Sequence, residues 1–214
     1  MKIFVVGANG QIGRQLTELL ANSSEHTVRG MVRKPEQTEN LEKIGAETKV
    51  ANLEGTVSEI VEAAKGCDAV IFTAGSGGKT GYDKTLLIDL DGAAKTIEAA
   101  KQAGIKRFIM VSALQANNRE NWNEQIKPYY VAKHYADKIL EASGLTYTIV
   151  RPGGLLNEPG TGKVTAKENL TRSSIPREDV ANTLLAAITE ENTFNRSFDL
   201  VSGSTPIPEA LKSL

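Results

Sequence analysis

The chain has 214 residues, of which 25 are basic and 26 acidic, and its formal net charge is −1. Such a balanced charge gives no reason to expect nucleic acid or an anionic membrane as a partner. The single cysteine excludes an internal disulfide, and one cysteine with two histidines is too few for a Cys/His metal site.

Apolar runs in the sequence are short. None reaches the roughly 18 residues that a membrane span needs. The first predicted strand begins at residue 2, which leaves no room for a signal peptide. We therefore expect a cytoplasmic protein, monomeric or homodimeric, whose partner is a small-molecule substrate.

Short β-branched runs alternate along the chain with longer amphipathic segments. The predicted strands cover 2–6, 26–32, 47–51, 68–75, 107–113, 146–154 and 197–201. The predicted helices cover 11–21, 38–44, 57–65, 83–103, 129–143 and 177–189, with a short helix in the tail. This alternation predicts an α/β fold with a doubly wound parallel sheet of strand order 3-2-1-4-5-6. We expect one domain over 1–214, with 151–214 contributing most of a small C-terminal substrate lobe.

A glycine-rich turn, GANGQIG, joins the first predicted strand to the first helix. Gly7 permits the tight turn, Gly10 lets the backbone approach a pyrophosphate, and Gly13 allows close packing of helix and strand. The spacing is GxxGxxG, one residue longer in its first interval than GxGxxG. Between a clear strand and a helix it predicts a Rossmann dinucleotide site, the alternative being a purely structural turn. The predicted contacts are Gly7, Asn9, Gly10, Gln11, Ile12 and Gly13.

Two cations follow the second predicted strand, where an NAD site would show a carboxylate. Arg33 and Lys34 in GMVRKP favour a 2′-phosphate, and therefore NADP over NAD. The alternative is that both only solvate a strand end. Arg14, just after the glycines, either joins the phosphate site or faces solvent.

Asn52 and Leu53 follow the third predicted strand and would lie beside the adenine in this architecture. The Asn52 amide could hydrogen-bond the base edge. An asparagine that ends a strand and starts a turn is an equal alternative.

A tyrosine and a lysine lie four residues apart on the helix predicted over 129–143. Tyr129 and Lys133 therefore share one face. A neighbouring ammonium group favours the phenolate and so lowers a tyrosine pKa, which suits a proton donor or acceptor for a carbonyl that undergoes hydride transfer.

The Tyr-x-x-x-Lys pair, the glycine turn, TAG after the fourth strand and SGLTYTIVRPGGL around the sixth together resemble one family. The chain is similar over essentially its whole length to the atypical short-chain dehydrogenase/reductase superfamily, the NAD(P)-binding, NAD-dependent epimerase/dehydratase-like branch. The resemblance implies that Tyr129 is the acid/base and that Lys133 holds the nicotinamide ribose. It further implies cofactor contacts from Thr73, Ala74, Gly75, Pro152 and Gly153.

One departure concerns the hydroxyl that this family usually carries after strand five. The strand here ends Val111-Ser112-Ala113, so the expected position is Ala113. Either Ser112 substitutes for it or the catalytic set is incomplete, with weaker stabilisation of the substrate carbonyl.

Simpler roles are expected for three other residues. His134 is predicted to be a helix-surface residue. Asp179 is predicted to be a capping or first-turn carboxylate. Trp122 either forms a flap over the substrate or packs against its neighbours.

The function that these patterns favour is an NADP-dependent oxidoreductase acting on a small carbonyl or quinone-like substrate. The alternatives are a nucleotide-sugar epimerase or dehydratase, a flavin or biliverdin-type reductase, and an NAD(P)-binding redox sensor without turnover. The small C-terminal lobe disfavours a bulky sugar nucleotide, whereas Ala113 favours the sensor.

Overall fold

The computed structural model describes residues 1–78 and 80–214. Its strands are β1 (Lys2–Val6), β2 (Thr27–Val32), β3 (Glu47–Val50), β4 (Ala69–Phe72), β5 (Arg107–Val111), β6 (Thr146–Pro152), β7 (Gly154–Leu156), β8 (Lys163–Lys167), β9 (Ser174–Pro176), β10 (Arg196–Ser202) and β11 (Thr205–Pro206). Its helices are α1 (Gln11–Ala21), α2 (Thr38–Glu42), α3 (Val57–Ala64), α4 (Tyr82–Lys84), α5 (Ala93–Gln102), α6 (Lys127–Glu141), α7 (Arg177–Ala186) and α8 (Ile207–Lys212). A π-helical segment, η2 (Thr85–Gly92), joins α4 to α5.

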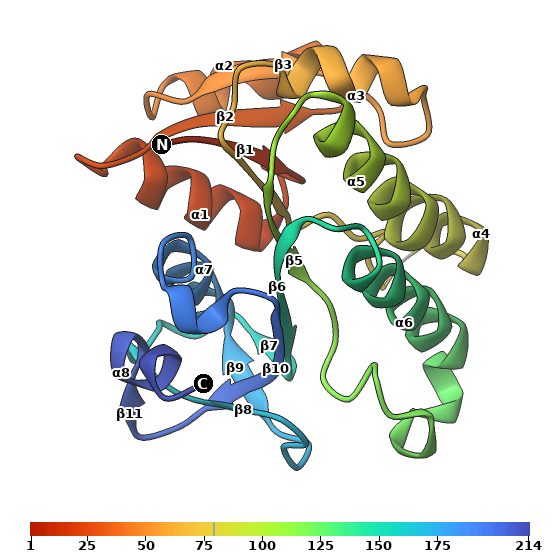
Figure 1. Cartoon of the computed structure of the whole chain (residues 1–214), viewed down its shortest axis with the longest axis vertical. Coiled ribbons are helices and arrows are strands. Elements are labelled where there is room, and N and C mark those ends of the chain that lie inside the picture. Colours follow the sequence, from red (N-terminus) through yellow and green to blue (C-terminus); the bar gives the residue numbers. More distant parts are fainter. Residues whose placement is uncertain (79) are drawn as a thin grey trace.

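One nine-stranded sheet forms the centre of the fold, in the order β11-β8-β10-β6-β5-β4-β1-β2-β3 (Figure 1). The run β3-β2-β1-β4-β5-β6 is parallel throughout and confirms the predicted order 3-2-1-4-5-6. β10 extends it in parallel, whereas β8 and β11 add antiparallel pairs at that edge. β7 and β9 form a separate two-stranded sheet.

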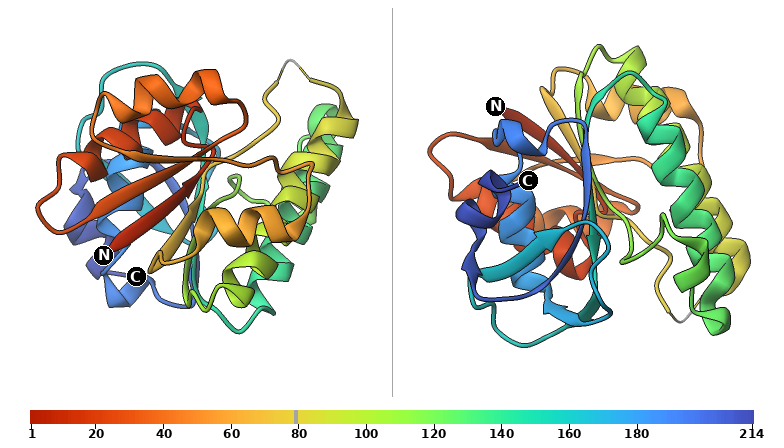
Figure 2. Two further views of the ribbon diagram at one scale, coloured as in Figure 1. Left: turned by 90° about the horizontal axis from the view of Figure 1, so that it is seen from above. Right: turned by 60° about the horizontal axis from the view of Figure 1, so that its bottom comes forward.

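Helices cover both faces of the sheet, which explains why its strands are apolar on both sides (Figures 1 and 2). Alternate residues of β1 show this directly. Ile3 and Val5 belong to the core shared with α1, α7 and α8. Phe4 and Val6 belong to the core shared with α3, α5 and α6.

The parallel strands end at one edge of the sheet, so the segments that follow them meet there. The end of β1 touches the loop after β4, because Thr73 donates its backbone N–H to the Val6 carbonyl over 2.9 Å. The loop after β5 touches β6 through Leu114 N–H and the Pro152 carbonyl at 2.9 Å. This edge is therefore the place where the sequence-predicted site residues can converge.

The helix predicted over 83–103 differs most from expectation. The chain over this range forms three consecutive helical segments: α4, the π-helical segment η2, and α5. Wider π turns do not follow the 3.6-residue period on which the prediction was based, and they are frequent at functional sites. The wide segment carries one buried carboxylate, Asp89, toward the sheet.

No helix in 1–78 and 80–214 is long and apolar enough to cross a bilayer.

Candidate functional site

The loop after β1 has no room for side chains at its outer glycines. Gly7 has φ +86°, and a Cβ there would lie 2.7 Å from the Ala74 nitrogen. A Cβ on Gly13 would lie 2.1 Å from the Gly7 carbonyl oxygen. The expected tight turn and close helix packing are therefore present in the structure.

Helix α1 presents an uncapped N-terminus at this loop. Its N-cap is Gly10, no side chain caps it, and its first turn holds no acidic residue. The first N–H groups of a helix have no partner within it and carry the positive end of the dipole. An oxyanion such as a pyrophosphate fits this set of donors.

Arg14 lies exposed on the first turn of α1. Its Nε and Nη2 donate to Asn9 Oδ1 over 3.0 and 2.6 Å. The guanidinium is fixed beside the loop by Asn9 and is exposed to solvent, which fits both of the alternatives for Arg14.

Arg33 and Lys34 lie exposed at the carboxyl end of β2. Their backbone N–H groups donate to Gln37 Oε1 over 2.9 and 3.0 Å, which fixes the turn that carries them. Neither side chain pairs with a carboxylate among residues 1–78 and 80–214. Both charges are thus available to a phosphate, and both are equally compatible with a solvated strand end.

Asn52 takes part in a turn after β3. Its Oδ1 accepts from Glu54 N–H over 3.0 Å and its carbonyl accepts from Gly55 N–H over 2.9 Å. Leu53 is buried in the core. The side-chain oxygen of Asn52 is therefore used within the turn, as the alternative interpretation of this residue predicts.

The loop after β4 is held from two sides. Thr73 Oγ1 donates to the Val6 carbonyl over 3.0 Å. Farther along, a Cβ on Gly75 would lie 3.1 Å from Asp89 Oδ1, and Ser76 N–H donates to Asp89 Oδ2 over 2.9 Å. Asp89 therefore fixes Gly75 and Ser76, at the end of the Thr73–Gly75 segment that the resemblance assigns to the cofactor.

Lys133 is buried and held by two oxygens. Its Nζ lies 3.2 Å from Asp89 Oδ1 and donates to the Val111 carbonyl over 3.2 Å. Burial alone would lower the pKa of Lys133, but attraction to Asp89 and further contributions outweigh it, so the pKa is raised. Lys133 is a fixed cation at the end of β5.

Asp89 was not predicted from the sequence. The available signal was a lone carboxylate in the apolar stretch TLLIDL. The regular helix predicted there gave no reason to expect this carboxylate beside Lys133.

Tyr129 lies one helical turn before Lys133, with Lys133 Nζ 5.8 Å from the Tyr129 ring centroid. Burial raises the pKa of the Tyr129 hydroxyl, and this outweighs the lowering by Lys133. The expected net decrease in this pKa is therefore wrong, because burial destabilises the phenolate by more than the ammonium group of Lys133 stabilises it. The phenol is kept protonated at neutral pH.

Ser112 does not accompany Tyr129. Its hydroxyl lies close enough to Asp137 to lower the pKa of that carboxyl, whose pKa burial nevertheless raises. The Ser112 hydroxyl makes no well-formed hydrogen bond with any described residue. Asp137 lies eight residues after Tyr129, about 12 Å along the helix. We therefore exclude Ser112 from the proposed catalytic set.

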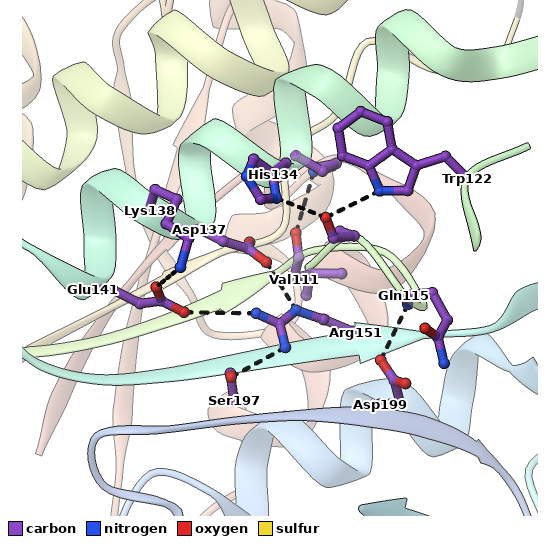
Figure 3. Close-up of polar contacts among 12 residues, drawn as sticks. Val111, Gln115, Trp122, His134, Asp137, Lys138, Glu141, Arg151, Ser197 and Asp199 are labelled. Atoms are coloured by element: carbon purple, nitrogen blue, oxygen red, sulfur yellow. Dashed lines mark hydrogen bonds and ion pairs between the residues drawn. The ribbon is translucent and has the colours of Figure 1, made fainter. Parts of the chain in front are cut away.

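Asp137 belongs to a buried charge network behind the site (Figure 3). Arg151 Nε donates to Asp137 Oδ2 over 2.8 Å, and Arg151 Nη1 donates to Ser197 Oγ over 3.1 Å. The network ties α6 to β6 and β10.

Ala113 packs with Trp122 and Tyr130, and Tyr129 packs against the same cluster. A methyl group thus occupies the position at which the resemblance expects a hydroxyl.

Trp122 packs against its neighbours, as one of its two alternatives predicts. Its ring stacks on Tyr130 with centroids 6.0 Å apart. Trp122 Nε1 donates to the Ala116 carbonyl over 3.2 Å, and His134 Nδ1 lies 2.9 Å from the same oxygen (Figure 3). His134 is buried rather than on the helix surface, and its role is to hold this loop.

The segment after β6 is tightly packed. Gly153 N–H donates to the Leu200 carbonyl over 2.9 Å, and a Cβ on Gly153 would lie 2.2 Å from the Ser173 carbonyl oxygen. Pro152 and Gly153 therefore form a fixed wall between β10 and the loop before β9.

Asp179 lies in the first turn of α7, as predicted, but it does not cap the helix. Its carboxylate accepts from Thr161 N–H at 3.0 Å and Gly162 N–H at 2.8 Å, so it anchors the loop before β8. No metal-binding group of three or more His, Cys, Asp or Glu side chains occurs in the described part of the chain.

Comparison with known proteins decides the family. The family model for NAD(P)H-binding proteins matches residues 7–191. The chain belongs to the NAD(P)H-binding family. This NAD(P)H-binding protein is 70% identical, over 100% of both chains, to a Bacillus subtilis protein called "Uncharacterized sugar epimerase YhfK".

Two solved structures are also similar to this NAD(P)H-binding protein. A putative NAD-dependent epimerase/dehydratase from Bacillus halodurans has a TM-score of 0.94 and 44% identity over 100% of both chains. The oxidoreductase ylbE from Lactococcus lactis has a TM-score of 0.92 and 33% identity over 100% of this chain and 96% of that one.

Substitution of Gly13 by alanine tests the glycine turn. Because the new Cβ would meet the Gly7 carbonyl at 2.1 Å, the turn must shift away from the N-terminus of α1. We expect Gly13→Ala to weaken NADPH binding at least about tenfold, since the backbone donors no longer converge. A fluorescence titration with NADPH measures this. Gly78→Ala, where a Cβ meets nothing within 4 Å, is the matched control. Equal affinity of the two variants would contradict the account.

Proposed function

We propose that this protein is an NADP-dependent oxidoreductase that transfers a hydride to or from a small carbonyl or quinone-like substrate. The observation that carries the proposal is the buried Lys133, held at 3.2 Å from Asp89 and one helical turn from Tyr129 at the nucleotide edge of the sheet. When bound, the cofactor supplies or accepts the hydride.

Three groups of residues would hold the cofactor. The Gly7–Gly13 turn and the N-terminus of α1 would bind the pyrophosphate, since they offer uncapped N–H groups. Thr73, Ala74 and Gly75 would line its middle, and the Pro152–Gly153 wall would cover the nicotinamide.

Tyr129 would supply the proton for carbonyl reduction. As the carbonyl carbon gains the hydride, its oxygen takes the proton of the Tyr129 hydroxyl and the phenolate remains. The fixed charge of Lys133 stabilises this phenolate until water reprotonates it. The raised pKa of Tyr129 suits a donor that must be protonated before the reaction.

The choice of NADP over NAD rests on Arg33 and Lys34. Two exposed cations at the carboxyl end of β2 would attract the negative charge of a 2′-phosphate. A guanidinium also binds phosphate in a bidentate manner.

A redox sensor without turnover is the second candidate, and Ala113 is the observation that favours it. With a methyl group in place of the hydroxyl, polarisation of a substrate carbonyl has one hydrogen bond fewer. The intact Tyr129–Lys133 pair favours the enzyme. Sugar epimerisation, which the name of the Bacillus subtilis relative suggests, remains a further alternative with the same cofactor site.

Replacement of Tyr129 by phenylalanine tests the proton donor. Phenylalanine keeps the ring but removes the hydroxyl, so carbonyl reduction with NADPH should fall at least about 100-fold in kcat. NADPH affinity should be unchanged, which shows that the site is intact. Tyr135→Phe, on the exposed side of α6, is the control. Full turnover in Tyr129→Phe would reject this donor.

Cofactor preference tests the cations after β2. Wild-type protein should bind NADPH more tightly than NADH. Arg33→Ala with Lys34→Ala should lose that preference, because the 2′-phosphate then lacks the two cations after β2. Direct titration of both cofactors on both proteins decides the matter. A preference that survives the double substitution would mean that these cations only face solvent.

A further inference from the structure

Arg172, in the loop between β8 and β9, reaches the residue next to the proposed proton donor. Its Nη1 donates to the Tyr130 hydroxyl over 2.8 Å, and its Nη2 donates to the Asn121 carbonyl. The guanidinium carbon also lies 5.4 Å from the Tyr130 ring centroid. The Tyr130 ring meets the Tyr129 ring edge-on, with centroids 5.9 Å apart. Arg172 is therefore one aromatic ring away from Tyr129.

The loop that carries Arg172 is fixed on both sides. Before it, Leu170 N–H donates to Asp199 Oδ2 over 3.0 Å, and the Leu170 carbonyl accepts from Gln115 Nε2 over 2.8 Å. After it, the Ser173 carbonyl accepts from Gly154 N–H over 2.9 Å. Arg172 thus lies between the Tyr129 side of the site and the Pro152–Gly153 wall, where the proposed reaction takes place.

Two backbone positions around Arg172 have the left-handed conformation that non-glycine residues rarely adopt. Gln115 has φ 64° and Asn169 has φ 56°. Gln115 is also buried, and its backbone N–H donates to Asp199 Oδ1 over 3.1 Å (Figure 3). Such conformations persist only where surrounding contacts hold them, and they concentrate at functional sites.

The charge of Arg172 is uncompensated. No carboxylate among residues 1–78 and 80–214 lies within ion-pair distance of its guanidinium. The other cation of the site, Lys133, is balanced by Asp89. Arg172 also uses two of its five N–H donors on Tyr130 and Asn121, which leaves three for a ligand.

We propose that Arg172 binds an oxyanion substituent, a carboxylate or a phosphate, of the carbonyl substrate. A guanidinium fork matches both groups in a bidentate manner and is the residue type best suited to them. The cofactor phosphates are assigned to the α1 end of the site, so this cation is left for the substrate. The inference rests on the proposed function for the place of the reacting carbonyl.

Trp122 offers a direct binding readout, because it is the single tryptophan of the chain and stacks on Tyr130. We would titrate the NADP⁺-loaded protein with two matched pairs while following its fluorescence. The first pair is succinate semialdehyde and butanal, and the second is glyceraldehyde 3-phosphate and glyceraldehyde. In at least one pair the charged aldehyde should bind at least about tenfold more tightly, and the pair that responds identifies the anion.

Arg172→Gln should abolish this difference, because glutamine keeps a polar side chain with N–H donors but carries no charge. Arg172→Lys should retain part of it. Arg196→Gln, an exposed arginine at the start of β10, should behave as wild type. NADP⁺ affinity should be the same in all variants.

Two results would overturn the proposal: no preference for either charged aldehyde in the wild type, or a preference that persists in Arg172→Gln. Failure of the proposed function has a different signature. In that case Arg172-dependent binding would be present, but no Tyr129-dependent turnover would accompany it.

Discussion

The buried ion pair between Asp89 and Lys133 is the interaction on which the candidate site depends. It joins η2 to α6 at 3.2 Å, and Lys133 also donates to the end of β5. The second carboxylate oxygen of Asp89 holds the loop after β4. One carboxylate therefore positions both the loop proposed to line the cofactor and the charged end of the proposed catalytic pair.

Such a pair is costly to break. The attraction between two buried charges offsets their desolvation only when both are present. Removal of one partner typically lowers the free energy of unfolding by about 3–5 kcal/mol. The π-helical segment makes the pair possible, because it brings Asp89 inward from a helix whose other side is exposed at Leu86 and Leu87. The helix therefore departs from regular α-helical geometry in the segment that carries Asp89.

Around this pair the site has two positively charged ends, each suited to an anion. The glycine turn and the cations after β2 offer an uncapped helix terminus and free positive charge, which suit cofactor phosphates. At the other end, Arg172 is held by Tyr130 and Asn121 beside the Pro152–Gly153 wall. The reacting carbonyl would lie between them, beside Lys133, which is ion-paired with Asp89.

Much of this arrangement could be predicted from the sequence, because its signals are local. The alternation of apolar runs with amphipathic segments predicted the strand order, and the three glycines predicted a turn without side chains. What the sequence did not indicate depends on distant contacts. Asp89 meets Lys133 only after a π-helical segment forms, and Ser112, just after β5, lies beside Asp137 of α6 only once the chain has folded. The net direction of the shift in the Tyr129 pKa likewise depends on burial, which cannot be inferred from a four-residue spacing in the sequence.

The most direct test of the account is the pKa of Lys133 itself. With lysine labelled at Cε, the ¹³C shift of Lys133 can be followed against pH and assigned from Lys133→Met. The attraction of Asp89 predicts a midpoint above the ordinary lysine value of about 10.4. The stability that this ion pair contributes would then be complete below that value and be lost as pH rises through the folded pKa. A midpoint below the ordinary value would mean that burial outweighs the attraction of Asp89, which would contradict the account.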